Sequence, residues 1–303
     1  MFLLRRVLTT VSLHACVCTL QSSLWFYLED ISVGHAFPQM PNTVSIGELM
    51  TGKPGKALPR ELEDFLSASN DEVILVAFGS WFDYIPHDIV RKLCDAFNDR
   101  KNRLRVIWKM KDTNPCSRSD GRVKVVPWLP QNDLLADPRV RIFICHAGFS
   151  SIIQAVYHAK PLVIFPIVFD QPTNAAAAES KGFAIRMDIG NFSSEMLLSN
   201  IDKLLNDPTY MRNVQLSSAI LRDRPDTPAQ RVSAMIDHVI KHGDRHLRTG
   251  AYKLSIAQFF MFDIFAVLLA AAFIVLFFVI LTICCVYRVC CVRYCKRKKS
   301  KMA

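Results

Sequence analysis

The 303-residue sequence lacks the residue patterns that most often hold metal ions. No Asp-x-Asp pair occurs in the chain, so a familiar carboxylate arrangement for a divalent cation is missing. The ten cysteines show no paired metal-binding spacing, and Cys16-x-Cys18 is too tight for a zinc knuckle. The spacings of Cys94, Cys116 and Cys145 imply no disulfide framework either. We therefore expect neither a metal nor another cofactor.

Charged residues are missing from one long stretch, between Ile264 and Tyr287. An apolar run of this length spans the hydrocarbon core of a bilayer as a helix. The alternative is a buried core helix, but a soluble helix this long would need a polar face, and this segment has none. The sequence predicts a single transmembrane helix over residues 264–287.

Acidic residues are missing after this helix, where positive charges gather. Seven cations there leave only +3 of the formal +10 for the rest of the chain, so the net charge does not indicate nucleic-acid binding. The bias instead predicts a cytosolic tail and a large domain on the other side of the membrane. The seven are Arg288, Arg293, Lys296, Arg297, Lys298, Lys299 and Lys301.

The tail region holds two further patterns. Lys299 and Lys301 fit the K-x-K-x-x form of cytosolic tails that return proteins to the endoplasmic reticulum, although a basic cluster can also serve only to stop transfer of the helix. Five cysteines lie in or beside the helix, where cysteines are either candidates for palmitoylation or simply small apolar residues. They are Cys284, Cys285, Cys290, Cys291 and Cys295.

The N-terminus loosely resembles a secretory signal. Arg5 and Arg6 precede a moderately apolar stretch, but two threonines and His14 interrupt its apolar centre. The sequence leaves open whether residues 1–24 act as a signal peptide.

Short apolar runs alternate with amphipathic segments between residues 73 and 181. The runs at 73–78, 104–108, 123–126, 141–145 and 161–165 are typical of buried strands. Helices are expected at 86–97, 132–136, 150–158 and 172–181. The alternation predicts an α/β fold in which a Rossmann-like, mostly parallel sheet carries helices on both faces. Cys145 ends one of the runs, so we expect it to be buried rather than reactive.

A helical region follows the predicted sheet. We expect helices from Ser193 or Ser194 to Leu205, over 208–221 and over 227–241. Asn191 begins the only N-x-S/T glycosylation sequence, in a polar loop, as suits a luminal domain.

A histidine-containing turn lies where the strand at 141–145 ends and a helix is expected. His146 is followed by Gly148, Ser150 and Ser151. Free N–H groups and the dipole at a helix N-terminus attract phosphate, and a ring nitrogen and two hydroxyls add to them. Alone this motif is weak, because a single histidine after a strand is more often a structural residue. Its value comes from its neighbours.

Those neighbours resemble a known signature. Trp128 and Gln131 lie 18 and 15 residues before His146, and Asp170-Gln171 begins 24 residues after it. Together with Gly79-Ser80, the stretch resembles the UDP-glycosyltransferases, most closely the animal membrane-bound UDP-glucuronosyltransferases. The resemblance runs roughly from residue 37 to the C-terminus, includes the membrane helix and lysine tail, and favours retention in the endoplasmic reticulum.

The resemblance implies a donor-binding site. Trp128 would stack on uracil, and Gln131 would bond the edge of the base or the ribose. Asp170 and Gln171 would bond the hydroxyls of the donor sugar. The full set is Gly79, Ser80, Trp128, Gln131, His146, Gly148, Ser150, Ser151, Gln154, Asp170, Gln171 and Asn174.

Three positions depart from the family pattern. Ser150 stands where many relatives carry Asn, and Gln154 stands where they usually carry Glu, so a charge near the ribose is lost. Lys109 replaces an Arg that is common after the family's tryptophan, here Trp108. Donor affinity or choice is expected to differ accordingly.

The family's acceptor-binding domain, which carries a catalytic histidine oriented by an aspartate, has no counterpart in the first 36 residues. His14 and His35 lie there, but neither has a surrounding fold to position it, so both are expected to be ordinary loop histidines and we assign no catalytic base. We expect the C-terminal half of a GT-B glycosyltransferase followed by its membrane anchor. The expected divisions are a remnant at 1–36, a donor-binding domain at 37–245, a juxtamembrane segment at 246–263, the membrane helix at 264–287 and a basic tail at 288–303.

The predicted function is metal-independent, inverting transfer of a glucuronosyl or hexosyl group from a UDP-sugar to a small lipophilic acceptor. The alternative is a catalytically silent donor-binding module that associates with full-length relatives. Expected partners are the UDP-sugar, the acceptor, the membrane and further copies or relatives, but no nucleic acid. The expected location is the endoplasmic reticulum membrane, crossed once, with the large domain in the lumen.

Overall fold

The computed structural model describes residues 22–47, 57–79, 85–99, 104–111, 116 and 121–300. Residues 23–244 form one compact unit, and the residues from Arg245 onward belong to a second. Ser80, Lys301, His14 and most of the signal-like segment lie outside the described residues.

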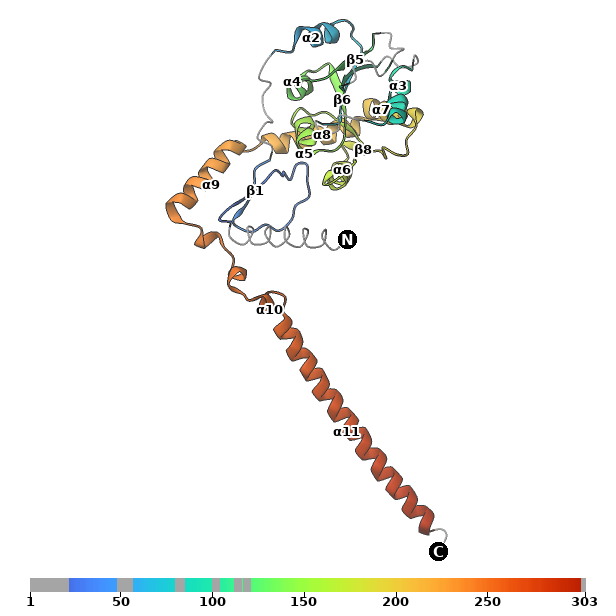
Figure 1. The fold of residues 1–303 in the computed structure, drawn as a ribbon, viewed down its shortest axis with the longest axis vertical. Helices are drawn as coiled ribbons and strands as arrows, with labels where there is room; N and C mark the ends of the chain where they lie inside the picture. The colour runs from blue at the N-terminus through green and yellow to red at the C-terminus, as the bar shows by residue number, and fades with distance from the viewer. Residues whose placement is uncertain are drawn as a thin grey trace, which may run out of the picture. The chain divides into compact units, whose positions relative to one another are not determined.

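A six-stranded sheet forms the centre of the first unit (Figure 1). Its order is β5-β4-β3-β6-β7-β8, and every neighbouring pair is parallel, which confirms the predicted sheet. The last strand was not predicted. The bounds are β3 Val73–Ala77, β4 Arg105–Lys109, β5 Val123–Val126, β6 Val140–Cys145, β7 Leu162–Ile164 and β8 Ala184–Arg186.

Helices cover both faces of this sheet, as expected. Val73, Leu75 and Ala77 belong to one apolar core, and Ile74 and Val76 to the other, because successive strand side chains point to opposite faces. The first core is built with α2 (Arg60–Ser67), α4 (Gln131–Ala136), α5 (Phe149–Tyr157), α6 (Gln171–Ser180) and α8 (Pro208–Arg222). The second is built with α3 (His87–Phe97) and α7 (Ser194–Asn206).

Side chains fix where the later helices begin. The Ser193 side chain accepts a hydrogen bond from the Met196 amide, so Ser193 caps α7. Thr227 and Gln230 form a capping box at the start of α9 (Pro228–His242). The predicted starts of these helices are confirmed to within a residue.

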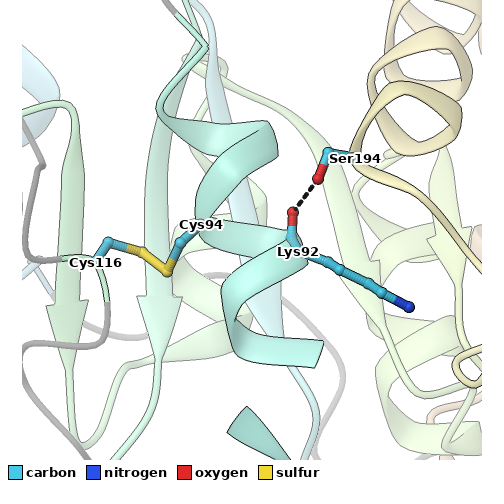
Figure 2. Close-up of a disulfide and its surroundings, with 4 residues drawn as sticks. All are labelled: Lys92, Cys94, Cys116 and Ser194. Atoms are coloured by element: carbon cyan, nitrogen blue, oxygen red, sulfur yellow. Dashed lines mark hydrogen bonds between the residues drawn. A yellow bond between two sulfur atoms is a disulfide. The ribbon is translucent and has the colours of Figure 1, made fainter. Parts of the chain in front are cut away.

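A disulfide joins Cys94 of α3 to Cys116, beyond β4 (Figure 2). The expectation that the cysteine spacing implied no disulfide was therefore wrong. The two residues are separated by 22 positions, and they meet because α3 packs against the sheet. Figure 2 also shows Ser194 Oγ donating to the Lys92 carbonyl at 2.8 Å, which ties α7 to α3. Cys145 is fully buried, as predicted, and burial raises the pKa of its thiol to about 12.

The segment before α2 packs onto the same unit. It contains β1 (Trp25–Tyr27) and β2 (Thr43–Ser45), which pair in parallel. Asp30 is completely buried and forms an ion pair with Arg224 at 2.5 Å, and Arg231 donates to the Ser45 carbonyl at 2.9 Å. Residues 23–36, expected to be part of a remnant, thus belong to the compact unit.

The second unit is mostly one long helix. After two short 3₁₀ turns (Arg245–Leu247 and Gly250–Lys253), α10 (Ile256–Phe259) precedes α11 (Phe262–Ser300). The part of α11 from Phe262 to Cys291 contains a stretch with a mean hydropathy of 3.3, and none of that stretch is buried. Among the described residues it is the one helix long and apolar enough to cross a membrane.

Candidate functional site

The predicted site residues lie at the carboxyl ends of neighbouring strands. From β3 the chain continues to β4 and β5 on one side, and then returns to β6 on the other side. The β3–β6 neighbourhood is therefore a topological switch point, where open α/β sheets bind their ligands. Gly79 follows β3 and His146 follows β6 at this point.

The His146 ring lies between two glycines. A Cβ added to Gly79 would be 2.8 Å from His146 Cε1, and one added to Gly148 would be 2.7 Å from Nε2. Both distances are too short for any side chain larger than hydrogen. Gly79, His146 and Gly148 thus form one packed group at the N-terminus of α5, and this arrangement explains the two glycines physically.

A lysine lies against this group. Lys109, the last residue of β4, donates from Nζ to the Gly79 carbonyl at 3.0 Å. The pKa of His146 is lowered from 6.5, first by burial and then by Lys109, while Asp170 opposes the shift. The imidazole is consequently neutral at pH 7. Sequence reasoning treated Lys109 only as a departure from the family and missed its place in the site.

The polar amides on α4 and α5 form a second group. Gln131 Nε2 donates to Gln154 Oε1 at 2.8 Å and approaches Ser151 Oγ at 3.4 Å. His158 Nε2 and Asn132 Oδ1 are 2.9 Å apart, which holds the two helices together. Trp128, just before α4, is 67% exposed, so its indole is available for stacking.

A third group stands at the start of α6. Asn174 Nδ2 donates to Asp170 Oδ2 at 2.6 Å and to the carbonyl of Ala147 at 3.1 Å. Ala147 has a φ of 67°, a left-handed conformation that costs a non-glycine residue about 1–2 kcal/mol. Asn174 therefore links Asp170 to the strained turn that carries His146.

The side chain of Gln171 makes different contacts from that of Asp170. It is buried, and its Oε1 accepts hydrogen bonds from the amides of Ile167 and Val168 at 2.8 and 3.0 Å. Its side-chain carbonyl thus shapes the loop after β7. The predicted sugar contact of Gln171 then depends on its amide nitrogen.

Asp170 and Asn174 line a cavity of about 410 Å³ together with the segment before α2. Phe149 at the start of α5 and the exposed residues His35 and Phe37 lie on its wall. His35 was expected to be an ordinary loop histidine, and it is indeed exposed, but its place on the wall of the same cavity as Asp170 could not be foreseen from the sequence.

No group of three or more His, Cys, Asp or Glu side chains is placed to hold a metal ion within the part of the chain that the structure describes. The structure thus brings most of the predicted residues that it describes into three groups, with Ser150 and Gln171 outside them. Ser150 lies exposed in the first turn of α5, and Asn191 is exposed in the turn before α7.

Solved structures share the fold. The glycosyltransferase of kitacinnamycin matches with a TM-score of 0.56 and 20% identity over 65% of this chain and 49% of its own. The calicheamicin glycosyltransferase CalG4 matches with a TM-score of 0.53 and 18% identity over 66% of this chain and 49% of its own. At these identities the likeness concerns the fold, which is that of the GT-B glycosyltransferases.

Sequence comparison gives the family. The family model "UDP-glucoronosyl and UDP-glucosyl transferase" matches residues 7–301, and the chain belongs to this family. The mouse 2-hydroxyacylsphingosine 1-beta-galactosyltransferase is 33% identical over 86% of this chain and 47% of its own length. Human UDP-glucuronosyltransferase 2B10 is 34% identical over 88% of this chain and 50% of its own length. The chain thus spans about half the length of the curated relatives it matches.

Proposed function

We propose that the switch point binds the donor of a glycosyl transfer, a UDP-sugar, and that the chain serves inverting transfer to a small lipophilic acceptor without a metal. The observation that carries the proposal is the packed group of Gly79, His146 and Gly148 at the N-terminus of α5, with Lys109 beside it. Negative charge builds on the diphosphate as the sugar leaves, and this group offers positive potential at that point.

Three contributions would stabilise the leaving diphosphate. The first-turn amides and dipole of α5 attract anions. Lys109 adds a full charge held in place by the Gly79 carbonyl. The neutral His146 ring donates one hydrogen bond without adding charge. Together they take the part that a divalent cation plays in other nucleotide-sugar enzymes.

The other groups suit the two ends of the donor. The exposed Trp128 indole offers a face for uracil. The linked Gln131 and Gln154 amides suit the ribose hydroxyls, because the bond between them fixes both side chains while each keeps another polar atom for a ligand. Asp170, oriented by Asn174, accepts hydrogen bonds from sugar hydroxyls.

The cavity beside Asp170 is where an acceptor would approach the sugar. Its wall includes Phe37, Phe149 and Leu28, which suit an apolar molecule. The names of the relatives cover galactosyl transfer to a sphingosine lipid and glucuronosyl transfer, and we propose a hexosyl or glucuronosyl donor on that ground.

Calorimetry tests the donor site directly. The full chain in detergent should bind UDP, and Trp128→Ala and Lys109→Met should weaken binding, whereas Trp25→Phe, on β1 and outside the three groups, should not. Undetectable UDP binding by folded protein would refute the proposal. Turnover of a phenolic acceptor is then measured with the chain alone and together with a full-length relative. The anomeric coupling of the product, read by NMR, reports inversion.

We further propose that the large unit, formed by residues 23–244, faces the lumen of the endoplasmic reticulum and that α11 crosses the membrane once. The Cys94–Cys116 disulfide suits an oxidising compartment, and the exposed Asn191 suits glycosylation there. The basic end of α11 and Lys299 would then lie in the cytosol. A glycosidase-sensitive mass that disappears in Asn191→Gln supports this orientation, and its absence from glycosylating membranes would contradict it.

A further inference from the structure

The described cysteines fall into two classes: those that are disulfide-bonded or buried, and those that are exposed free thiols. In the large unit, Cys94 and Cys116 are oxidised to a disulfide and Cys145 is completely buried. On α11, Cys284, Cys285, Cys290 and Cys291 are free thiols, all exposed. They are therefore the exposed free thiols among the residues whose side chains the structure describes, and donor binding uses none of them.

Their positions along α11 separate them into two pairs. Asp263 is the last charged residue before the apolar run, so the run can be counted from Ile264. At about 1.5 Å per residue, Cys284 lies about 30 Å along the helix, which is the thickness of the hydrocarbon core. Cys290 lies about 39 Å along it, and a typical tilt of about 20° shortens this only to about 37 Å. Cys284 and Cys285 thus lie at the edge of the hydrocarbon core, and Cys290 and Cys291 lie among the lipid headgroups.

A thiol at headgroup depth can meet both a water-soluble acyl donor and the bilayer. A long acyl chain on Cys290 or Cys291 needs to extend only about 7 Å to re-enter the hydrocarbon core, and each further CH₂ is then buried favourably. Cys284 and Cys285 lie too deep for a charged acyl donor to reach. Arg288 and Arg293 flank the second pair in sequence, and their charges favour the approach of an anionic donor.

We propose that Cys290 and Cys291 are sites of S-acylation by a long-chain fatty acyl-coenzyme A. The cysteine thiolate attacks the thioester carbonyl carbon, a new carbon–sulfur bond forms, and the bond to coenzyme A breaks. Coenzyme A leaves as a thiolate and takes up the proton that the cysteine lost, so no oxidant or reductant is needed. The inference depends on the cytosolic placement of the tail, where acyl-coenzyme A is present, and not on donor binding.

The test is acyl exchange on the full chain expressed in cells. Free thiols are first blocked with N-ethylmaleimide, thioesters are then cleaved with hydroxylamine, and each freed thiol is tagged with maleimide-polyethylene glycol of known mass. Wild-type protein should show one or two added tags. Cys290→Ser/Cys291→Ser should lose at least nine-tenths of the tagging, whereas the matched variant Cys284→Ser/Cys285→Ser should keep it. Metabolic labelling with an alkyne fatty acid should give the same ranking.

Three outcomes would overturn the proposal: no tagging of wild-type protein, tagging that survives Cys290→Ser/Cys291→Ser, or tagging lost in Cys295→Ser instead. Protease digestion of a C-terminal epitope in sealed microsomes is run on the same samples. An epitope that resists digestion would show that the proposed orientation fails, whereas a digested epitope without tagging shows that the acylation proposal itself is wrong. The affinity of the serine variants for UDP, measured by calorimetry, should equal that of the wild-type protein.

Discussion

Substitution of Gly148 by alanine is the sharpest test of the donor site, because it changes the position of one ring. The added Cβ would lie 2.7 Å from His146 Nε2. Ordinary contact between such atoms needs about 3.5 Å, so the imidazole must move by about 0.8 Å. Gly148 has a φ of −61° and a ψ of 137°, which alanine adopts without strain. The main effect therefore falls on the ring rather than on the backbone.

The expected loss follows from the hydrogen bond that the ring would make to phosphate. A bond to a charged group contributes about 1.5–3 kcal/mol, and a displacement of this size should remove about 1–2 kcal/mol of it. UDP binding should then weaken by about 5- to 30-fold. Stability should fall by about 1 kcal/mol, since Gly148 is the N-cap of α5 and alanine is a poorer N-cap than glycine.

A double-mutant cycle measured by calorimetry isolates the ring. Gly148→Ala, His146→Ala and the double variant are compared in detergent, with thermal melting as the control for folding. In the His146→Ala background, Gly148→Ala should change the dissociation constant by less than about 2-fold, because no ring remains to displace. Additive losses in the double variant would refute the reasoning. Gly79→Ala serves as a contrast, since its φ of 85° adds a folding cost of about 1–2 kcal/mol.

Three further predictions concern the large unit. Lys109→Met should weaken UDP binding about 10-fold and raise the pKa of His146, followed by NMR, whereas Lys109→Arg should largely restore binding, because arginine keeps the charge. Burial lowers the pKa of His158 from 6.5 to about 4, so the folded state resists protonation, and the free energy of unfolding should fall as pH drops from 6.5 through 4. The loss should be on the order of 1–2 kcal/mol after allowance for partial exposure, and denaturant melts of His158→Gln should show a flatter dependence on pH. Cys94→Ser/Cys116→Ser opens a loop of 22 residues and should cost about 3 kcal/mol, seen as a melting temperature about 6–12 °C lower, and an unchanged melt would contradict this.

The sheet and most of its helices could be predicted from the sequence because their signals are local. The buried strands are continuous apolar runs, and β5 at Val123–Val126 coincides with the predicted run. The caps at Ser193 and Thr227 are visible in the sequence as polar residues before amphipathic segments. Strand β8, Ala184–Arg186, gives no comparable pattern, because Arg186 interrupts its short apolar stretch.

The contacts that join distant segments could not be predicted. Cys94 and Cys116 carry no spacing motif, and only the packing of α3 brings them together. His35 lines the same cavity as Asp170, in a segment that the buried ion pair between Asp30 and Arg224 joins to a residue nearly two hundred positions away. The family resemblance likewise named the residues expected to bind the donor. It could not show that Gln171 is buried against its own loop or that Lys109 contacts Gly79, because these contacts depend on the folded chain.

The continuous length of α11 determines which basic residues at the end of the chain can interact with the membrane surface. Its 39 residues make a helix about 58 Å long, nearly twice the hydrocarbon thickness of a bilayer. In the proposed orientation, the backbone at Lys299 stands about 22 Å beyond the core, whereas ionic screening limits the reach of lipid charge to about 8 Å. Arg288 lies within that reach and Lys299 does not. Arg288 would therefore bind the anionic membrane surface, and the terminal lysines would remain available to a protein that recognises the tail.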